Sequence, residues 1–241
     1  MGVVFYEKKL KKTDMKLKTK HSHNLYLLIA ILLQLLIYPF FEGTEYKSII
    51  LNILSTFVLI TAVYVIGFGR KQLITAIGLG GFAFVGIWYV VFVEPRYYLA
   101  IFSVICRISF DVYVISLILV SLFRAKQVTS NTIYGAVSVY LLIGTMFSIL
   151  YKFMETLMPG SFFIGETRSL DFVFFSFTTL TTLGYGDITP VSAYARTATS
   201  LQAIIGVLYT AILISRFVGI YIAQHLGKNH SNQNTNTWSN V

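Results

Sequence analysis

Charged residues and cysteine are scarce in this chain of 241 residues. Charged side chains make up 12% of it and apolar ones 56%, whereas about a quarter of a soluble domain is charged. A soluble core has no use for so much apolar surface, so the composition predicts an integral membrane protein. The single cysteine, Cys106, excludes an intrachain disulfide and any cysteine-rich metal site.

The sequence also lacks the patterns of an active site. It contains no nucleophile with a positioned base and no cluster with metal-ligand spacing, so we do not expect an enzyme. Four histidines lie near the chain ends, where solvated side chains are favoured over a metal or pH-sensing cluster. They are His21, His23, His225 and His230.

Basic residues give the chain a net charge of +9, and they gather beside the apolar segments. Seven lysines precede the first of these segments: Lys8, Lys9, Lys11, Lys12, Lys16, Lys18 and Lys20. This placement is typical of the positive-inside rule of membrane proteins, and nucleic-acid binding is not expected. The same lysines are suited to hold anionic lipid headgroups.

Six apolar segments are long enough to cross a bilayer, which requires roughly 17 to 25 residues. They cover residues 25–41, 49–68, 73–93, 97–123, 133–151 and 195–223. Gln34 and Pro39 interrupt the first of them. The segment 169–181 is apolar but too short to cross, so we expect a re-entrant helix there. The predicted fold class is an all-α membrane protein with six transmembrane helices.

An even number of spans places both chain ends on one side of the membrane. With cytoplasmic ends, thirteen basic residues lie at the inner boundary: Lys8, Lys9, Lys11, Lys12, Lys16, Lys18, Lys20, Arg70, Lys71, Arg124, Lys126, Arg216 and Lys228. Five fall outside: Lys47, Arg96, Lys152, Arg168 and Arg196. The asymmetry predicts a multi-pass protein of the cell membrane with cytoplasmic N- and C-termini.

A glycine-rich motif, Thr181-Thr182-Leu183-Gly184-Tyr185-Gly186-Asp187, lies between the last two spans. Non-helical backbone is tolerated at membrane depth only where it is buried in protein or lines a watery path. Gly184 and Gly186 lack a Cβ, so they can take a positive φ that turns neighbouring carbonyls the same way. The alternative is a glycine-rich turn that only joins two helices.

This motif resembles the selectivity filter of potassium channels, and the resemblance covers residues 132 to about 219. It implies that the carbonyl oxygens of Thr182, Leu183, Gly184 and Tyr185, with the Thr182 hydroxyl, bind K⁺, and that Gly186 completes the filter. Four copies around an axis stack rings of oxygens that replace the water shell of the ion. The implied assembly is a homotetramer with K⁺ as permeant ion and no other cofactor.

The resemblance also assigns the surroundings of the filter. Tyr185 is expected to point away from the axis, with Phe174 and Phe175 packed against it, and Asp187 is expected at the outer mouth. Leu183 replaces the usual Val or Ile, and Thr178 lies where some channels carry a glutamate that bonds the mouth aspartate. Ser169 is a plausible N-cap of the short helix, whose C-terminal dipole end favours a cation.

The last span carries a second set of candidate residues. Gly206 lies where the family commonly has a hinge glycine, although a small residue for close helix packing explains it equally well. Val207, Thr210 and Ile214 share one face at helical spacing and are expected to line an inner cavity. Arg196 and Arg216 are interpreted as anchors at opposite membrane boundaries. The outer helix, pore helix, filter and inner helix form a pore domain over residues 130–224.

The first four spans, over residues 24–125, resemble voltage-gated potassium channels in layout but lack a series of arginines. Arg107 lies within the fourth span, and Asp111, four residues later, is positioned to pair with it on one helix face. A single paired arginine predicts a channel without steep voltage gating. Residues 1–23 form a basic tail, and residues 225–241 are expected to be disordered.

A potassium channel is therefore the leading interpretation, with passive conduction down the electrochemical gradient. The alternative is a subunit of a potassium transporter, or a non-conducting partner of a channel. Transporters related to this pore carry four degenerate pore repeats in one chain, whereas this sequence contains one.

Overall fold

The computed structural model describes residues 23–41, 44, 46–65, 70–92, 97–164 and 171–238. The N-terminal lysines, Arg96 and Ser169 lie outside the described residues. The elements are α2 (His23–Ile37), η1 (Tyr38–Phe41), α3 (Lys47–Val65), α4 (Arg70–Phe92), α5 (Tyr97–Arg124), α6 (Ser130–Leu157), β1 (Phe162–Ile164), α7 (Asp171–Leu180), β2 (Ile188–Pro190) and α8 (Ala193–Trp238).

Six described segments are long and apolar enough to cross a membrane. They are His23–Phe41, Ser48–Val65, Arg70–Tyr89, Ile101–Arg124, Ser130–Leu157 and Ala193–Gln224. Each overlaps one of the six spans predicted from the sequence. The chain is therefore that of a mostly helical membrane protein.

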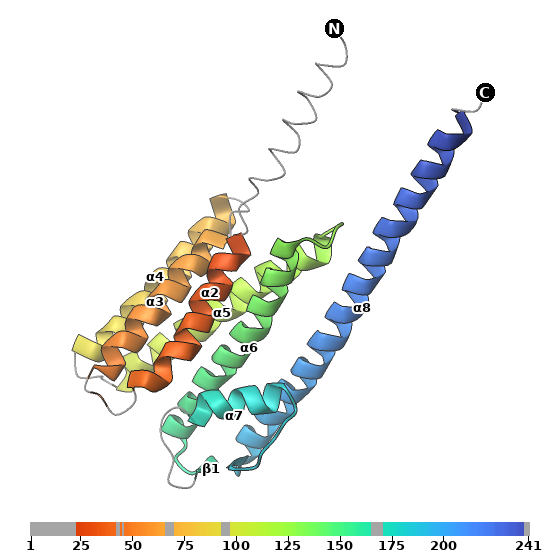
Figure 1. The fold of residues 1–241 in the computed structure, drawn as a ribbon. Coiled ribbons are helices and arrows are strands. Elements are labelled where there is room, and N and C mark those ends of the chain that lie inside the picture. Colours follow the sequence, from red (N-terminus) through yellow and green to blue (C-terminus); the bar gives the residue numbers. More distant parts are fainter. Residues whose placement is uncertain are drawn as a thin grey trace.

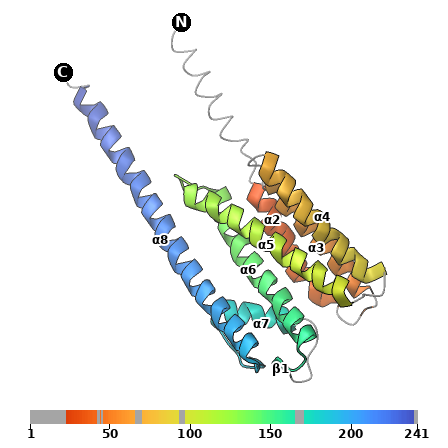
Figure 2. The same cartoon turned by 180° about the vertical axis from the view of Figure 1, so that it is seen from behind.

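Helices α2 to α5 form a bundle, and the long helix α8 lies at the edge of the molecule (Figure 1). Helices α2 to α5 pack side by side, α6 lies against this bundle, and α8 stands on the far side of α6 and α7 (Figure 1). Seen from behind, the same order holds, with α8 at the edge of the molecule (Figure 2). The buried core runs through α2–α7, whereas few residues of the apolar α8 segment are buried.

The start of α6 and the end of α5 are close in sequence, separated by the five residues 125–129. Thr129 is the N-cap of α6, and it forms a capping box with Thr132 in which each side chain bonds the other residue's backbone N–H. This cap starts α6 at a fixed position directly after α5. The bundle is consequently packed against α6 of its own chain.

The structure differs from the sequence prediction in three short elements, η1, β1 and β2. The first span changes to a 3-10 turn at Tyr38–Phe41, since Pro39 has no N–H to donate and its ring clashes with the preceding turn. Two short antiparallel strands, β1 and β2, pair with Phe163 opposite Thr189, although no strand was predicted. Aromatic and β-branched residues after the turn at Pro159 and Gly160 favour this pairing.

The sequence predicts disorder over residues 225–241, whereas the structure continues α8 to Trp238. Adding a residue to an existing helix forms one hydrogen bond without the cost of a new nucleus. A long apolar helix therefore extends into a polar segment that contains one glycine, Gly227, and no proline. The start of α2 and the end of α8 lie at the end of the molecule opposite α7 and β1 (Figure 1).

Candidate functional site

The site begins at the C-terminal end of α7, where the helix passes directly into the glycine-rich motif. The N–H of Thr182 donates to the carbonyl of Thr179 over 3.0 Å. The carbonyl of Thr178 accepts two backbone bonds, from the N–H of Leu183 at 2.8 Å and that of Gly184 at 3.2 Å, and a third bond from the Thr181 hydroxyl at 3.4 Å. The end of α7 therefore holds Thr182, Leu183 and Gly184 by their backbone.

Backbone handedness alternates along the motif. Thr182, Gly184 and Gly186 have positive φ angles of 61°, 56° and 82°, whereas Leu183 and Tyr185 between them do not. Positive φ at the two glycines was predicted from the sequence and is confirmed. Thr182 was not predicted, because a β-branched residue rarely takes this conformation, at a cost of about 1–3 kcal/mol.

The carbonyls of residues 182–185 differ from that of Thr181, which accepts the Thr182 hydroxyl at 2.6 Å. Within the described part of the chain, the carbonyl oxygens of residues 182–185 accept no hydrogen bond. The side chains of Leu183 and Tyr185 are 57% and 67% exposed, so this edge of the chain is uncovered. Unpaired carbonyls that follow one another in this way are available to bind a cation.

The two phenylalanines expected to pack against Tyr185 are separated by the structure. The ring of Phe174 stacks on that of Tyr185, with centroids 5.7 Å apart and 7° between the planes. Phe175 instead is 5% exposed and packs against Tyr151 and Phe162 in the core. Neighbouring residues on a helix point about 100° apart, so they cannot share one partner face.

The side chains of Thr178 and Asp187 do not bond each other. The Thr178 hydroxyl donates to the carbonyl of Phe175 at 3.0 Å. One carboxylate oxygen of Asp187 accepts the N–H of the next residue, Ile188, at 3.0 Å. Thr178 therefore contacts the motif through its backbone carbonyl, and Asp187 stabilises the start of β2.

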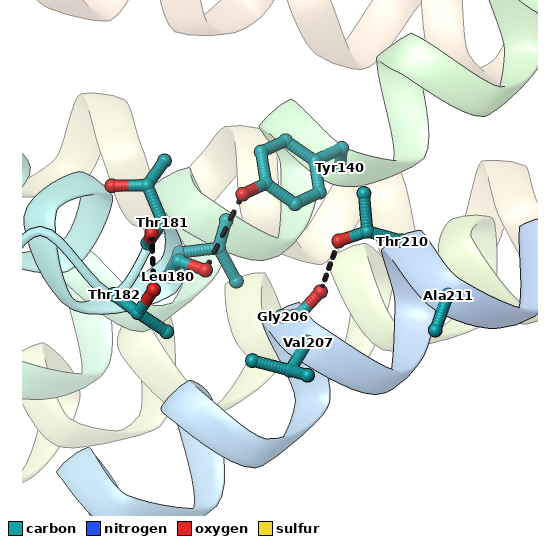
Figure 3. Close-up of a pocket in the computed structure, with 8 residues that line it drawn as sticks. All are labelled: Tyr140, Leu180, Thr181, Thr182, Gly206, Val207, Thr210 and Ala211. Carbon is teal, nitrogen blue, oxygen red and sulfur yellow. Dashed lines mark hydrogen bonds between the residues drawn. The ribbon is translucent and has the colours of Figure 1, made fainter. Parts of the chain in front are cut away.

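A pocket of about 420 Å³ lies beside the start of the motif, between α6, the end of α7 and α8 (Figure 3). Its lining comprises Tyr140, Leu180, Thr181, Thr182, Gly206, Val207, Thr210 and Ala211. Val207 and Thr210 were predicted to line such a cavity. Ile214 is 59% exposed and lies one turn beyond the pocket. The pocket joins Thr182 to the exposed face of α8.

Gly206 allows α8 to approach α7 closely. A Cβ at this position would lie 2.2 Å from the carbonyl oxygen of Leu180, which also accepts the Tyr140 hydroxyl at 3.3 Å. Among the two interpretations of Gly206, close packing therefore has direct support from the structure. The helix runs from Ala193 to Trp238 as one element through this point.

A buried polar network joins three helices behind the motif, and the sequence analysis missed it. Tyr151 of α6, Ser176 of α7 and Gln202 of α8 are each 0% exposed and are linked by hydrogen bonds. The available signal was Gln202 itself, a large polar side chain in the middle of an apolar span. Polar residues at such positions are costly unless they have partners.

Arg107 and Asp111 of α5 form the predicted pair. The Arg107 Nε lies 3.0 Å from a carboxylate oxygen of Asp111, and the two residues are 6% and 1% exposed. Among the described residues this is the only ion pair. Each charge is neutralised by its neighbour on the same helix.

Arg216 does more than anchor α8 at a membrane boundary. Its guanidinium donates to the carbonyls of Leu122, Phe123 and Ala125 at the C-terminal end of α5. It also lies 5.3 Å from the centroid of the Phe123 ring. The last carbonyls of a helix lack the N–H partners of a further turn, so the cation caps the end of α5 and ties it to α8.

Comparison with known proteins agrees with this geometry. Residues 135–223 match a protein-family model described as an ion channel. The matched segment contains most of α6, all of α7, the motif and the apolar part of α8. No curated protein and no solved structure matches the chain. The family match supports an ion-channel function for this membrane protein.

Proposed function

We propose that the protein is a potassium-selective channel in which four identical chains build one filter around a central axis. The observation that carries the proposal is the alternating backbone of residues 182–186, which leaves successive carbonyls unpaired at the end of α7. Rings of such carbonyls replace the hydration shell of K⁺ and allow it to pass without water.

The position of α7 supports the same ion. Its ten residues are too few to cross a bilayer, and its C-terminal end adjoins Thr182. Aligned peptide dipoles place about half a negative charge at that end of a helix. Four such helix ends around an axis would attract a cation to the pocket beside Thr182. In this proposal, α7 is the re-entrant pore helix and the motif is the selectivity filter.

The exposed surface of α8 supports assembly with further copies. One apolar stripe on this helix is uncovered: Leu201, Ile204, Leu208 and Ile212 are 49–54% exposed. A second stripe, formed by Val207, Ile214 and Val218, is 51–59% exposed and continues from the pocket beside the motif. In a closed ring of four chains, the first stripe packs against a neighbouring chain and the second lines the conduction path.

Conduction in this account depends only weakly on voltage. Moving one charge across the membrane field is worth about 2.3 kcal/mol per 100 mV, and steep gating needs three or four such charges in each subunit. The described fourth span offers Arg107, and its pair with Asp111 cancels that charge. A conductance that rose e-fold within a few millivolts would contradict this part of the proposal.

The test compares two glycines that both have a positive φ. Gly184 and Gly160 have positive φ angles of 56° and 85°, and a Cβ at either would meet nothing within 4 Å. Gly184→Ala is expected to abolish K⁺ flux into vesicles while the tetramer still assembles, because only Gly184 lies in the filter. Gly160→Ala, outside the motif, is expected to retain flux.

Two outcomes would count against the proposal. Undiminished K⁺ flux in Gly184→Ala would remove this residue from the conduction path. Absence of passive flux in the unmodified protein would favour the alternative of a transporter subunit or a non-conducting partner. Counting chains in the purified particle separates the channel from a transporter with several pore repeats in one chain.

A further inference from the structure

We infer that Gln202 is a positioning residue of the filter: it fixes α7 between α6 and α8 and so sets where the filter carbonyls lie. The inference rests on the proposed channel function. Gln202 does not touch the motif itself. It acts through Ser176, which lies four residues before the end of α7.

The hydrogen bonds of Gln202 belong to a chain of donors and acceptors in which each residue donates to the next. The Tyr151 hydroxyl donates to Gln202 Oε1 at 2.5 Å. Gln202 Nε2 donates to the Ser176 carbonyl at 3.0 Å and to Ser176 Oγ at 2.7 Å. The Ser176 hydroxyl in turn donates to the carbonyl of Gly144 at 2.6 Å. Since a carbonyl can only accept, the amide nitrogen must face Ser176.

The network cannot be replaced by water, because its members are fully buried. Tyr151, Ser176 and Gln202 each have 0% exposure. The helices are also in direct contact there, since a Cβ at Gly144 would lie 2.5 Å from the ring of Phe177. A buried donor or acceptor that loses its partner carries its full desolvation cost. The orientation of α7 is therefore strongly determined at Ser176.

This orientation is transmitted to the filter over a short distance. Thr178, two residues after Ser176, supplies the carbonyl that holds the N–H groups of Leu183 and Gly184. Any rotation or shift of α7 moves this carbonyl and the strained backbone of Thr182 with it. Because most ligands of the proposed ion sites are backbone carbonyls, a small displacement of the backbone changes their fit to K⁺ relative to Na⁺.

The experiment compares three variants in the network with a matched control. Gln202→Leu, Ser176→Ala and Tyr151→Phe each break the network, and the last two remove a single hydroxyl. Ser138→Ala is the control: Ser138 is also 0% exposed, but its hydroxyl donates only to Tyr134 of its own helix, α6. The ratio of K⁺ to Na⁺ permeability comes from reversal potentials in planar bilayers, and thermal unfolding is measured in parallel.

We expect the permeability ratio to fall by about tenfold in the network variants, which corresponds to about 1.4 kcal/mol. Ser138→Ala is expected to keep the wild-type ratio and to lower the unfolding temperature by less than Ser176→Ala, because it removes no bond between helices. An unchanged ratio in Ser176→Ala and Tyr151→Phe overturns the inference and leaves the channel proposal intact. An unmodified protein that does not select K⁺ overturns both.

Discussion

Replacement of Gly206 by alanine tests the contact between α8 and the end of α7. The added Cβ would lie 2.2 Å from the Leu180 carbonyl oxygen, and real Cβ atoms essentially never approach within 3.0 Å. The two helices must therefore separate by at least 0.8 Å at a point next to the filter. Overpacking of this kind costs about 1–3 kcal/mol.

A second glycine on the same helix isolates that steric cost. A Cβ at Gly219 would meet nothing within 4 Å. Both substitutions gain the same helix propensity, about 1 kcal/mol for alanine over glycine. Gly219→Ala is thus expected to be stabilised by about 1 kcal/mol, and Gly206→Ala to fall below it by the overpacking cost of about 1–3 kcal/mol.

The assay is thermal unfolding of both purified variants together with K⁺ flux in vesicles. Gly206→Ala is expected to unfold at a lower temperature than Gly219→Ala and to lose flux, since α7 moves with Leu180. Equal unfolding temperatures with wild-type flux in Gly206→Ala would refute the close contact between α8 and the Leu180 carbonyl.

Two further substitutions test other contacts of the site. Arg107→Ala leaves Asp111 buried without its partner and is expected to lower the free energy of unfolding by about 3–5 kcal/mol. A denaturant titration in detergent measures this change. A decrease of less than about 1 kcal/mol would contradict the pairing. Phe174→Ala removes the ring stacked on Tyr185 and is expected to reduce K⁺ selectivity with little loss of stability, whereas Phe175→Ala is expected to cost about 3–5 kcal/mol of stability because its ring is in the core. Reversal potentials and unfolding are measured for both variants. Loss of selectivity in Phe175→Ala together with loss of stability in Phe174→Ala would disprove the assignment.

The sequence was sufficient to predict features that depend on local chemistry. The six spans follow from long apolar runs, and the positive φ of Gly184 and Gly186 follows from the absence of a Cβ. The pairing of Arg107 with Asp111 follows from helical spacing. Each of these needs only residues that are close together in the chain.

Features that depend on the relative placement of helices could not be predicted. The φ of Thr182 contradicts the preference of a β-branched residue and exists because the end of α7 holds the next residues. The separation of Phe174 from Phe175 depends on the rotation of α7 about its axis. Gln202 finds Tyr151 and Ser176 on two other helices, and Arg216 finds the end of α5, 91 to 94 residues away.

The extension of α8 shows that composition alone does not determine where a helix ends. Composition alone predicted disorder after Ala223, because asparagine, serine and threonine do not build a core. The helix nevertheless continues to Trp238 from a segment that is already helical. Composition describes what a segment can bury, whereas helix continuation depends on the segment before it.

The reversal potential of the unmodified protein, in a planar bilayer with K⁺ on one side and Na⁺ on the other, tests the central claim most directly. The account predicts a potential close to the equilibrium potential of K⁺, since backbone carbonyls of residues 182–185 form the ion sites. A potential near zero, with both ions passing equally, would contradict it.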